Sequence, residues 1–304
     1  MGDERPRWID LVDPSADELK AEIPEQMHAT ALESLLAPHV HDDEPRPRIE
    51  SHGDYVLGIL LLPVAVPAED RVYYQEIDFI ATPETLVSIS KTPPGEQPFD
   101  PKPAKEACRL HEEVGMFAFH LVDEVAEGYL DLIDALDVEI DELEDMVAEK
   151  SPQEVGKRLR ELRHDLLGIR RTLSPTRDAV HKIVDNRVEL DDGELFPREV
   201  EISFGNAYDK LLRASEALDA SRDALAGVRD YLQGKISIDQ NEVMKRLTLI
   251  ASLLLVPTFI VGVYGQNFVK IPELHWMWGY WWSWGWILGT TIAQLVFFKW
   301  KRWI

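Results

Sequence analysis

A long uncharged apolar stretch near the end of the chain constrains this protein more than any other feature. Residues 247–264 carry no charged side chain and are about as long as the shortest helix that crosses a bilayer core of roughly 30 Å. A second uncharged stretch, residues 279–298, begins among clustered tryptophan and tyrosine residues and is followed by the basic tail 299–302. Aromatic belts and basic flanks are typical of membrane interfaces. The sequence therefore predicts two transmembrane helices joined by a loop at 265–278.

Basic residues predict the orientation of these two helices. Lys245 and Arg246 precede the first stretch and the basic tail follows the second, whereas the loop between them carries only Lys270. The positive-inside rule then places both termini in the cytoplasm and predicts a multi-pass protein of the inner (plasma) membrane. Two helices alone cannot enclose a water-filled path, so any ion path requires several copies around a shared axis.

The residues before the membrane segment predict an α+β cytoplasmic domain followed by a helical stalk. Period-two apolar runs and turn residues indicate short strands, with one run ending at Pro63. Ser15 and Glu18 have the spacing of a helix-starting capping box. The expected strands are residues 8–12, 55–62, 76–81 and 85–90, and the expected helix among them is 29–36. Prolines 98, 101 and 103 indicate a linker.

From about Cys108 onward the apolar spacing becomes helical. One helix is expected up to about Val147 and another from Pro152 to Leu173, where Pro175 kinks or restarts it. A long helix starts near Arg198, and if it continues to Tyr264 it is roughly 100 Å long. Its leucines repeat every seven residues as a packing seam at Leu211, Leu218, Leu225 and Leu232. We therefore divide the chain into a cytoplasmic α/β domain (1–107), a helical domain and stalk (108–245) and a transmembrane domain (246–304).

Charge and composition exclude several functions. The formal net charge of −23 repels nucleic-acid phosphate and attracts cations, so no nucleic-acid partner is expected. The single cysteine, Cys108, excludes an intramolecular disulfide and any cysteine-rich metal site, and we interpret it as a small buried side chain. Neither a phosphate-binding loop nor a nucleophile motif is present, so the sequence indicates neither an ATP-driven pump nor an enzyme.

Two polar segments offer alternative cation sites. The first is a histidine-rich run that can bind zinc, although an irregular spacing favours an exposed loop; it comprises His39, His41, Asp42, Asp43 and Glu44. The second is the acid-rich stretch 123–145, which can bind or screen cations but is more typical of a solvated helix face.

The loop after the first membrane stretch carries the motif Tyr264-Gly265-Gln266-Asn267-Phe268, followed by Ile271-Pro272-Glu273-Leu274. These residues resemble the signature of CorA-type magnesium transport proteins, Tyr-Gly-Met-Asn-Phe followed by Met-Pro-Glu-Leu. The runs 244–248 and 46–50, together with Tyr208-Asp209, resemble the same family. The resemblance covers nearly the whole chain and the order of its parts, and it implies a homopentameric divalent cation channel without catalytic activity.

The resemblance also implies a role for individual residues. Gly265, Gln266 and Asn267 correspond to the selectivity filter, flanked by Tyr264 and Phe268, and Glu273 corresponds to the outer mouth. Mg2+ dehydrates reluctantly, so a ring of Asn267 amide oxygens would accept hydrogen bonds from its water shell. Gly265 is expected to permit a backbone turn that leaves no room for a side chain. The implied pore-lining residues are Asn241, Thr248, Thr258 and Gly262, and the implied apolar gate is Met244, Leu247 and Leu255.

Two residues depart from the family pattern. Gln266 replaces the methionine of the signature, which adds an amide near the mouth or simply packs outward. Asn206 stands where the resemblance leads us to expect an acidic ligand of a regulatory magnesium site between subunits, so sensing of cytoplasmic Mg2+ is expected to be weak. The resemblance makes Mg2+ the expected cargo and a regulatory ligand. Transport of Zn2+, Co2+ or Ni2+, and a membrane-anchored scaffold or sensor that conducts nothing, remain the alternatives.

Overall fold

The computed structural model describes residues 6–24, 27–38, 44–66, 71–109, 112–191, 193–267 and 271–303. The chain forms two compact units, Met1–Arg229 and Asp230–Ile304, and the helix α6 contributes to both. The strands are β1 (Arg7–Val12), β2 (Arg48–Ser51), β3 (Val56–Val66), β4 (Arg71–Ala81) and β5 (Thr85–Lys91). The α-helices are α1 (Ala16–Glu22), α2 (Ala29–Leu36), α3 (Lys102–Ala107), α4 (Val114–Glu149), α5 (Pro152–Val184), α6 (Arg198–Tyr264) and α7 (Gly279–Trp300), with a short 3-10 turn η1 (Pro272–His275).

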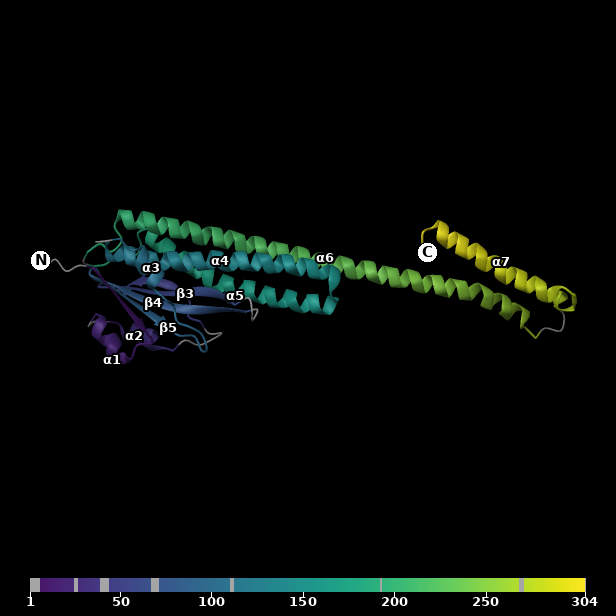
Figure 1. Ribbon diagram of the computed structural model, residues 1–304, viewed down its shortest axis with the longest axis horizontal. Coiled ribbons are helices and arrows are strands. Elements are labelled where there is room, and N and C mark those ends of the chain that lie inside the picture. Colours follow the sequence, from purple (N-terminus) through teal and green to yellow (C-terminus); the bar gives the residue numbers. More distant parts are fainter. Residues whose placement is uncertain are drawn as a thin grey trace. The chain divides into compact units, whose positions relative to one another are not determined.

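The first unit is built on a mixed five-stranded sheet in the order β1-β5-β4-β3-β2. β1 runs parallel to β5, and the other neighbours are antiparallel. Figure 1 shows α1 and α2 on one face of this sheet and the long helices α4, α5 and α6 on the other. Leu19 and Leu35 of the two short helices pack with Val87 and Ile89 of β5 in a core that excludes water. The predicted α+β domain is confirmed.

Local sequence signals set most of the element boundaries. Ser15 and Glu18 form the predicted capping box at the start of α1, and Ser151 and Glu154 form a second one at α5. Each serine hydroxyl accepts a backbone N–H that the first helical turn cannot satisfy internally. The long helix begins at Arg198 as predicted and runs without interruption to Tyr264. Its leucine seam is buried at all of the four positions listed above.

Three expectations about proline are wrong. β3 does not end at Pro63 but continues to Val66, because β2 pairs with β3 only as far as Ile59 and leaves an open edge beyond it. A residue without an N–H is tolerated at such an edge. The expected linker contains α3, with Pro103 in its first turn, where a missing N–H costs nothing. α5 neither ends nor restarts at Pro175 and continues to Val184.

Candidate ion pathway

The second unit is an antiparallel helical hairpin formed by the end of α6 and by α7. The Gln294 side-chain amide donates to the Ser252 carbonyl oxygen at 3.2 Å, and Lys245 Nζ donates to the Arg302 carbonyl oxygen at 3.1 Å. Leu249 and Phe298 are buried between the two helices. The start of the apolar stretch of α6 therefore lies beside the end of α7.

The packing of α7 divides the surface of α6 into two faces. Between residues 249 and 264, the side chains that are at least partly covered are Leu249, Ser252, Leu253, Val256, Pro257, Ile260 and Tyr264. The predicted pore-lining and gate residues are all exposed: Asn241, Met244, Leu247, Thr248, Leu255, Thr258 and Gly262. At about 100° per residue, these two sets lie on opposite faces of the helix. The predicted stripe is thus left uncovered within one subunit.

The two threonine hydroxyls on the uncovered stripe already donate to the helix backbone. The Thr248 hydroxyl donates to the Met244 carbonyl oxygen at 2.8 Å, and the Thr258 hydroxyl donates to the Leu254 carbonyl oxygen at 2.7 Å. Because each hydroxyl proton is used, the hydroxyl oxygen presents lone pairs outward. This arrangement suits contact with a cation or with the water around it. The assignment of these residues to a pore stays a prediction.

The motif loop follows directly after α6. The Gly265 N–H donates to the Val261 carbonyl oxygen at 2.8 Å, which continues the helical pattern for one residue, and Gln266 and Asn267 are then exposed. Both amide side chains are therefore free to meet a ligand at the end of the helix. Phe268 and the side chain of Glu273 lie outside the described residues, so their predicted roles are untested.

Little room is left for a side chain at Gly265. Its φ angle does not lie in the left-handed region, where the positive-φ glycines of the described chain are Gly53, Gly95 and Gly193. A Cβ atom at position 265 would instead approach the Val261 carbonyl oxygen to 3.1 Å. Glycine is therefore favoured here by close approach of the backbone rather than by an unusual backbone angle.

The region of the expected regulatory site is on the soluble part of α6. Asn206 and Asp209 are exposed, while the Tyr208 ring stacks on His181 with ring centroids 4.8 Å apart. Lys210 Nζ lies 2.8 Å from carboxylate oxygens of both Asp123 and Glu127. One lysine therefore neutralises part of the acid-rich face of α4. Most of the other acids on that face are exposed, which fits a solvated helix face.

A buried ionic cluster lies within the sheet on the α1–α2 side. Lys91 Nζ is 3.0 Å from Asp78 Oδ2, contacts the Glu76 carboxylate and donates to the Ser34 carbonyl oxygen at 2.8 Å. Burial raises the pKa of Asp78 to about 7, although Lys91 opposes this effect. Burial alone would lower the pKa of Lys91, but the two carboxylates outweigh it and raise that pKa. The sequence did not indicate this cluster, because its members meet only through strand pairing.

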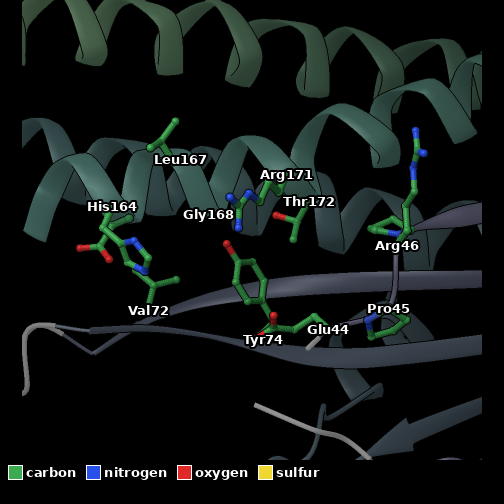
Figure 2. Close-up of a pocket in the computed structure, with 12 residues that line it drawn as sticks. Glu44, Pro45, Arg46, Val72, Tyr74, His164, Leu167, Gly168, Arg171 and Thr172 are labelled. Carbon is green, nitrogen blue, oxygen red and sulfur yellow. The ribbon is translucent and has the colours of Figure 1, made fainter. Parts of the chain in front are cut away.

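A cavity of about 610 Å³ lies between the sheet and α5. Figure 2 shows the residues that line it. The Tyr74 ring rises from β4 toward α5 near Gly168 and Thr172, and burial raises the pKa of Tyr74 to about 12. The cavity walls mix Arg46 and Arg171 with acidic side chains, so no single charge dominates. Glu44 lines this cavity, but the rest of the histidine-rich run, residues 39–43, lies outside the described residues.

One described helix, α6, is long and apolar enough to cross a membrane, and almost none of the residues in its most apolar 18-residue segment are buried. α7 does not pass the same test, since its many tryptophan and tyrosine residues lower its mean hydropathy. Of the two predicted spans, the first therefore has direct support from length and composition, and the second stays a prediction.

One continuous helix joins the sheet-containing unit to an apolar hairpin, and that helix is long and apolar enough to cross a membrane, so the fold is that of a membrane-anchored protein. The family model of the CorA-like Mg2+ transporter protein matches residues 3–302. This match spans nearly the whole chain, including both compact units. The chain belongs to the CorA-like Mg2+ transporter family and is a divalent metal transporter.

Individual relatives agree with this assignment. A cobalt/magnesium transport protein CorA of Thermotoga maritima is 28% identical over 98% of this chain and 84% of its own length. A protein with the same description from Methanocaldococcus jannaschii is 24% identical over 90% of this chain and 84% of its own length. The solved structure of the complete CorA magnesium transporter from that organism superposes with a TM-score of 0.78 at 22% identity, covering 98% of this chain and 91% of that chain. That likeness shows the fold.

Proposed function

We propose that this protein is a passive, selective channel for Mg2+ influx, assembled as a homopentamer around α6. The observation that carries the proposal is the uncovered stripe of α6, which bears the predicted pore residues and ends at the exposed amides of Gln266 and Asn267. Each doubly charged ion gains roughly 4.6 kcal/mol per 100 mV on entering a negative interior. No covalent chemistry is needed to drive transport.

In this proposal the Asn267 amide oxygens form a ring that accepts hydrogen bonds from the hydrated ion. Met244, Leu247 and Leu255 form apolar rings that close the pore by excluding water. These rings form only if the stripe of each subunit faces a shared axis in the assembly. The stripe is therefore uncovered within one subunit, and α7 packs on the outer side of α6. Glu273 is proposed to concentrate cations at the outer mouth.

The proposed topology places both termini in the cytoplasm, with α7 as the second span. Its support is the contact between Lys245 and Arg302, which brings the basic entry of α6 and the basic exit of α7 to the same end of the hairpin. Basic residues gather on the cytoplasmic side of membrane proteins.

Transport of Co2+, Ni2+ or Zn2+ is the second candidate function. Gln266 favours it, because an additional amide at the mouth changes the groups that meet the ion. The description of the Thermotoga relative as a cobalt/magnesium transport protein adds support.

A competition assay in liposomes separates the two candidates. Purified protein is reconstituted, and Mg2+ influx is recorded with an internal dye while external Co2+, Ni2+ or Zn2+ is varied. The proposal predicts that Mg2+ enters in the absence of the other ions and that they inhibit only at comparable or higher concentrations. Influx of a transition-metal ion with no Mg2+ influx would overturn the assignment to Mg2+ and favour the second candidate.

A further inference from the structure

Three side chains with metal-ligating atoms meet where α3 turns back into α4. They are Cys108, which ends α3, Glu112, which precedes α4, and His120, in the second turn of α4. The thiol sulfur, one carboxylate oxygen and one imidazole nitrogen all lie within 4.8 Å of one another. His120 Nε2 is 3.1 Å from Glu112 Oε2, so two of the three groups are already in contact.

The cluster is partly withdrawn from water. The side chains of Glu112 and His120 are each only 12% exposed, and Cys108 is partly buried. The Cys108 thiol donates to the Ala104 carbonyl oxygen at 3.4 Å. The nearest basic side chain on α3, Lys105, places its Nζ over the Trp8 ring, 5.3 Å from its centroid. A divalent cation bound here would balance the negative charges of two ligands, the Cys108 thiolate and the Glu112 carboxylate.

The geometry and the donor set fit a tetrahedral ion. Zinc–ligand distances of about 2.0–2.3 Å place tetrahedral ligand atoms roughly 3.5 Å apart, and the three ligand atoms lie within 4.8 Å of one another, so no pair needs to close by more than about 1.3 Å. Thiolate and imidazole ligands favour Zn2+, Co2+ and Ni2+, whereas Mg2+ prefers oxygen ligands in octahedral geometry. Water can supply the fourth position.

We propose that Cys108, Glu112 and His120 form a binding site for a transition-metal ion of the Zn2+ or Co2+ class in the soluble unit. The site is separate from the ion pathway, and its ligand differs from the proposed cargo. A bound ion links the end of α3 to the second turn of α4, and it is held in the presence of excess Mg2+.

The single cysteine makes a direct test possible. The full-length protein in detergent is titrated with Co2+ in the presence of excess Mg2+, and the near-ultraviolet absorption is recorded. Thiolate ligation of Co2+ gives an intense charge-transfer band, which in this chain can come only from Cys108. The proposal predicts a band that saturates at one Co2+ per chain and is displaced by Zn2+. Co2+ bound at the pore mouth by amide oxygens would not produce it.

Variants of Glu112 and His120 distinguish a three-ligand metal site from metal binding by the Cys108 thiol alone. Loss of groups that merely support a ligand typically weakens metal binding roughly 10- to 100-fold. His120→Asn and Glu112→Gln, which remove ligands, are therefore expected to weaken Co2+ binding by at least about 10-fold. Glu113→Gln removes the same charge one residue away, at an exposed position, and should bind as the wild type does. A band of unchanged strength and affinity in His120→Asn and Glu112→Gln would overturn the proposal.

A second measurement uses the wild-type protein alone, so it does not depend on the folding of any variant. The rate at which a maleimide modifies Cys108 is followed with Zn2+, with Mg2+ and with neither ion. The site predicts strong protection by Zn2+ and none by Mg2+. Equal modification rates under all three conditions, or the absence of the Co2+ band in the wild type, would show that the cluster binds no transition metal.

Discussion

Asn206 is exposed on α6, where family resemblance leads us to expect an acidic ligand. A neutral side chain contributes little to a hard-cation site, so closure by cytoplasmic Mg2+ is expected to be weak. Asn206→Asp adds one carboxylate per subunit and should shift Mg2+-dependent inhibition of influx to concentrations lower by roughly 3-fold or more. The measurement is influx into liposomes at graded Mg2+ on the cytoplasmic face.

The matched control for this change is Ser203→Asp, which adds the same charge one turn earlier on α6. An unchanged Mg2+ response in Asn206→Asp, or an equal shift in both variants, would show that position 206 is not part of a specific site.

Single residues were predictable from the sequence where local chemistry decides their role. Ser15 and Glu18 form a capping box because both groups lie within one helical turn. The motif singled out Gly265, and a Cβ atom there would approach the Val261 carbonyl oxygen to 3.1 Å, but its role in a filter stays a prediction. The Cys108 cluster was missed, because Cys108 looked like an isolated apolar side chain and His120 reaches it only once α4 has folded.

Among the helices and strands, α6 is the element that bears the proposed pore stripe. Leu253 lies on the face of α6 that α7 covers, whereas Leu255 lies on the uncovered pore stripe. Leu255→Ala should widen an apolar ring and raise basal influx, because a wider apolar constriction fills with water more readily. Leu253→Ala makes the same substitution on the opposite face and should leave basal influx near the wild-type rate.

These two variants are compared by divalent influx in liposomes under conditions that close the wild-type channel. Equal effects of the two substitutions on basal influx would contradict the assignment of the stripe, since the same side chain is shortened on opposite faces of α6.

The buried cluster on β4 and β5 predicts a pH dependence of stability. The pKa of Asp78 is raised to about 7 in the folded protein, mainly by burial, with Lys91, Glu76 and Arg48 as the charged groups that act on it. In the unfolded chain an aspartate ionises near pH 4. Between about pH 4 and 7 the folded state therefore binds a proton that the unfolded state has lost, and its stability falls as pH rises through this window.

In Asp78→Asn the stability of the folded state should fall less as pH rises, because the amide has no proton to lose. Thermal unfolding of the full-length protein in detergent, compared from about pH 5 to 8, measures it. Glu84→Gln, at an exposed acid in the same unit, should keep the wild-type slope. A variant Asp78→Asn with the same slope as the wild type would mean that Asp78 is ionised throughout.

Element type was largely predictable, and boundaries at proline were not. Capping boxes and apolar periodicity are local signals, and they correctly indicated α1, α2, the long helices and the strands β1, β3, β4 and β5, whereas β2 and α3 were missed. Whether Pro63 ends a strand depends on how far the neighbouring strand β2 extends, which only tertiary structure decides. Pro175 likewise stays within α5, where packing against the rest of the unit outweighs one lost hydrogen bond.

At the scale of the whole molecule, the order of the two units along the chain fits the family to which the protein belongs. The sheet-containing unit and the apolar hairpin share α6, so one continuous helix connects the first unit to the proposed pore. Within one subunit α7 covers only one face of that helix. Lipid can cover the proposed pore stripe, but water can reach it inside a bilayer only if further copies enclose it, and this is the physical argument for an oligomeric pore.

The central claim is that exposed Asn267 amides hold the hydrated ion. Wild type, Asn267→Ala and the neighbouring control Gln266→Met are reconstituted, and Mg2+ influx into liposomes is measured with the oligomeric state checked by size. A lost hydrogen bond costs about 1 kcal/mol, and symmetry repeats the loss in every subunit, so influx through Asn267→Ala should fall by at least roughly 10-fold while assembly persists. Gln266→Met should continue to transport. Wild-type rate and selectivity in Asn267→Ala would contradict the account.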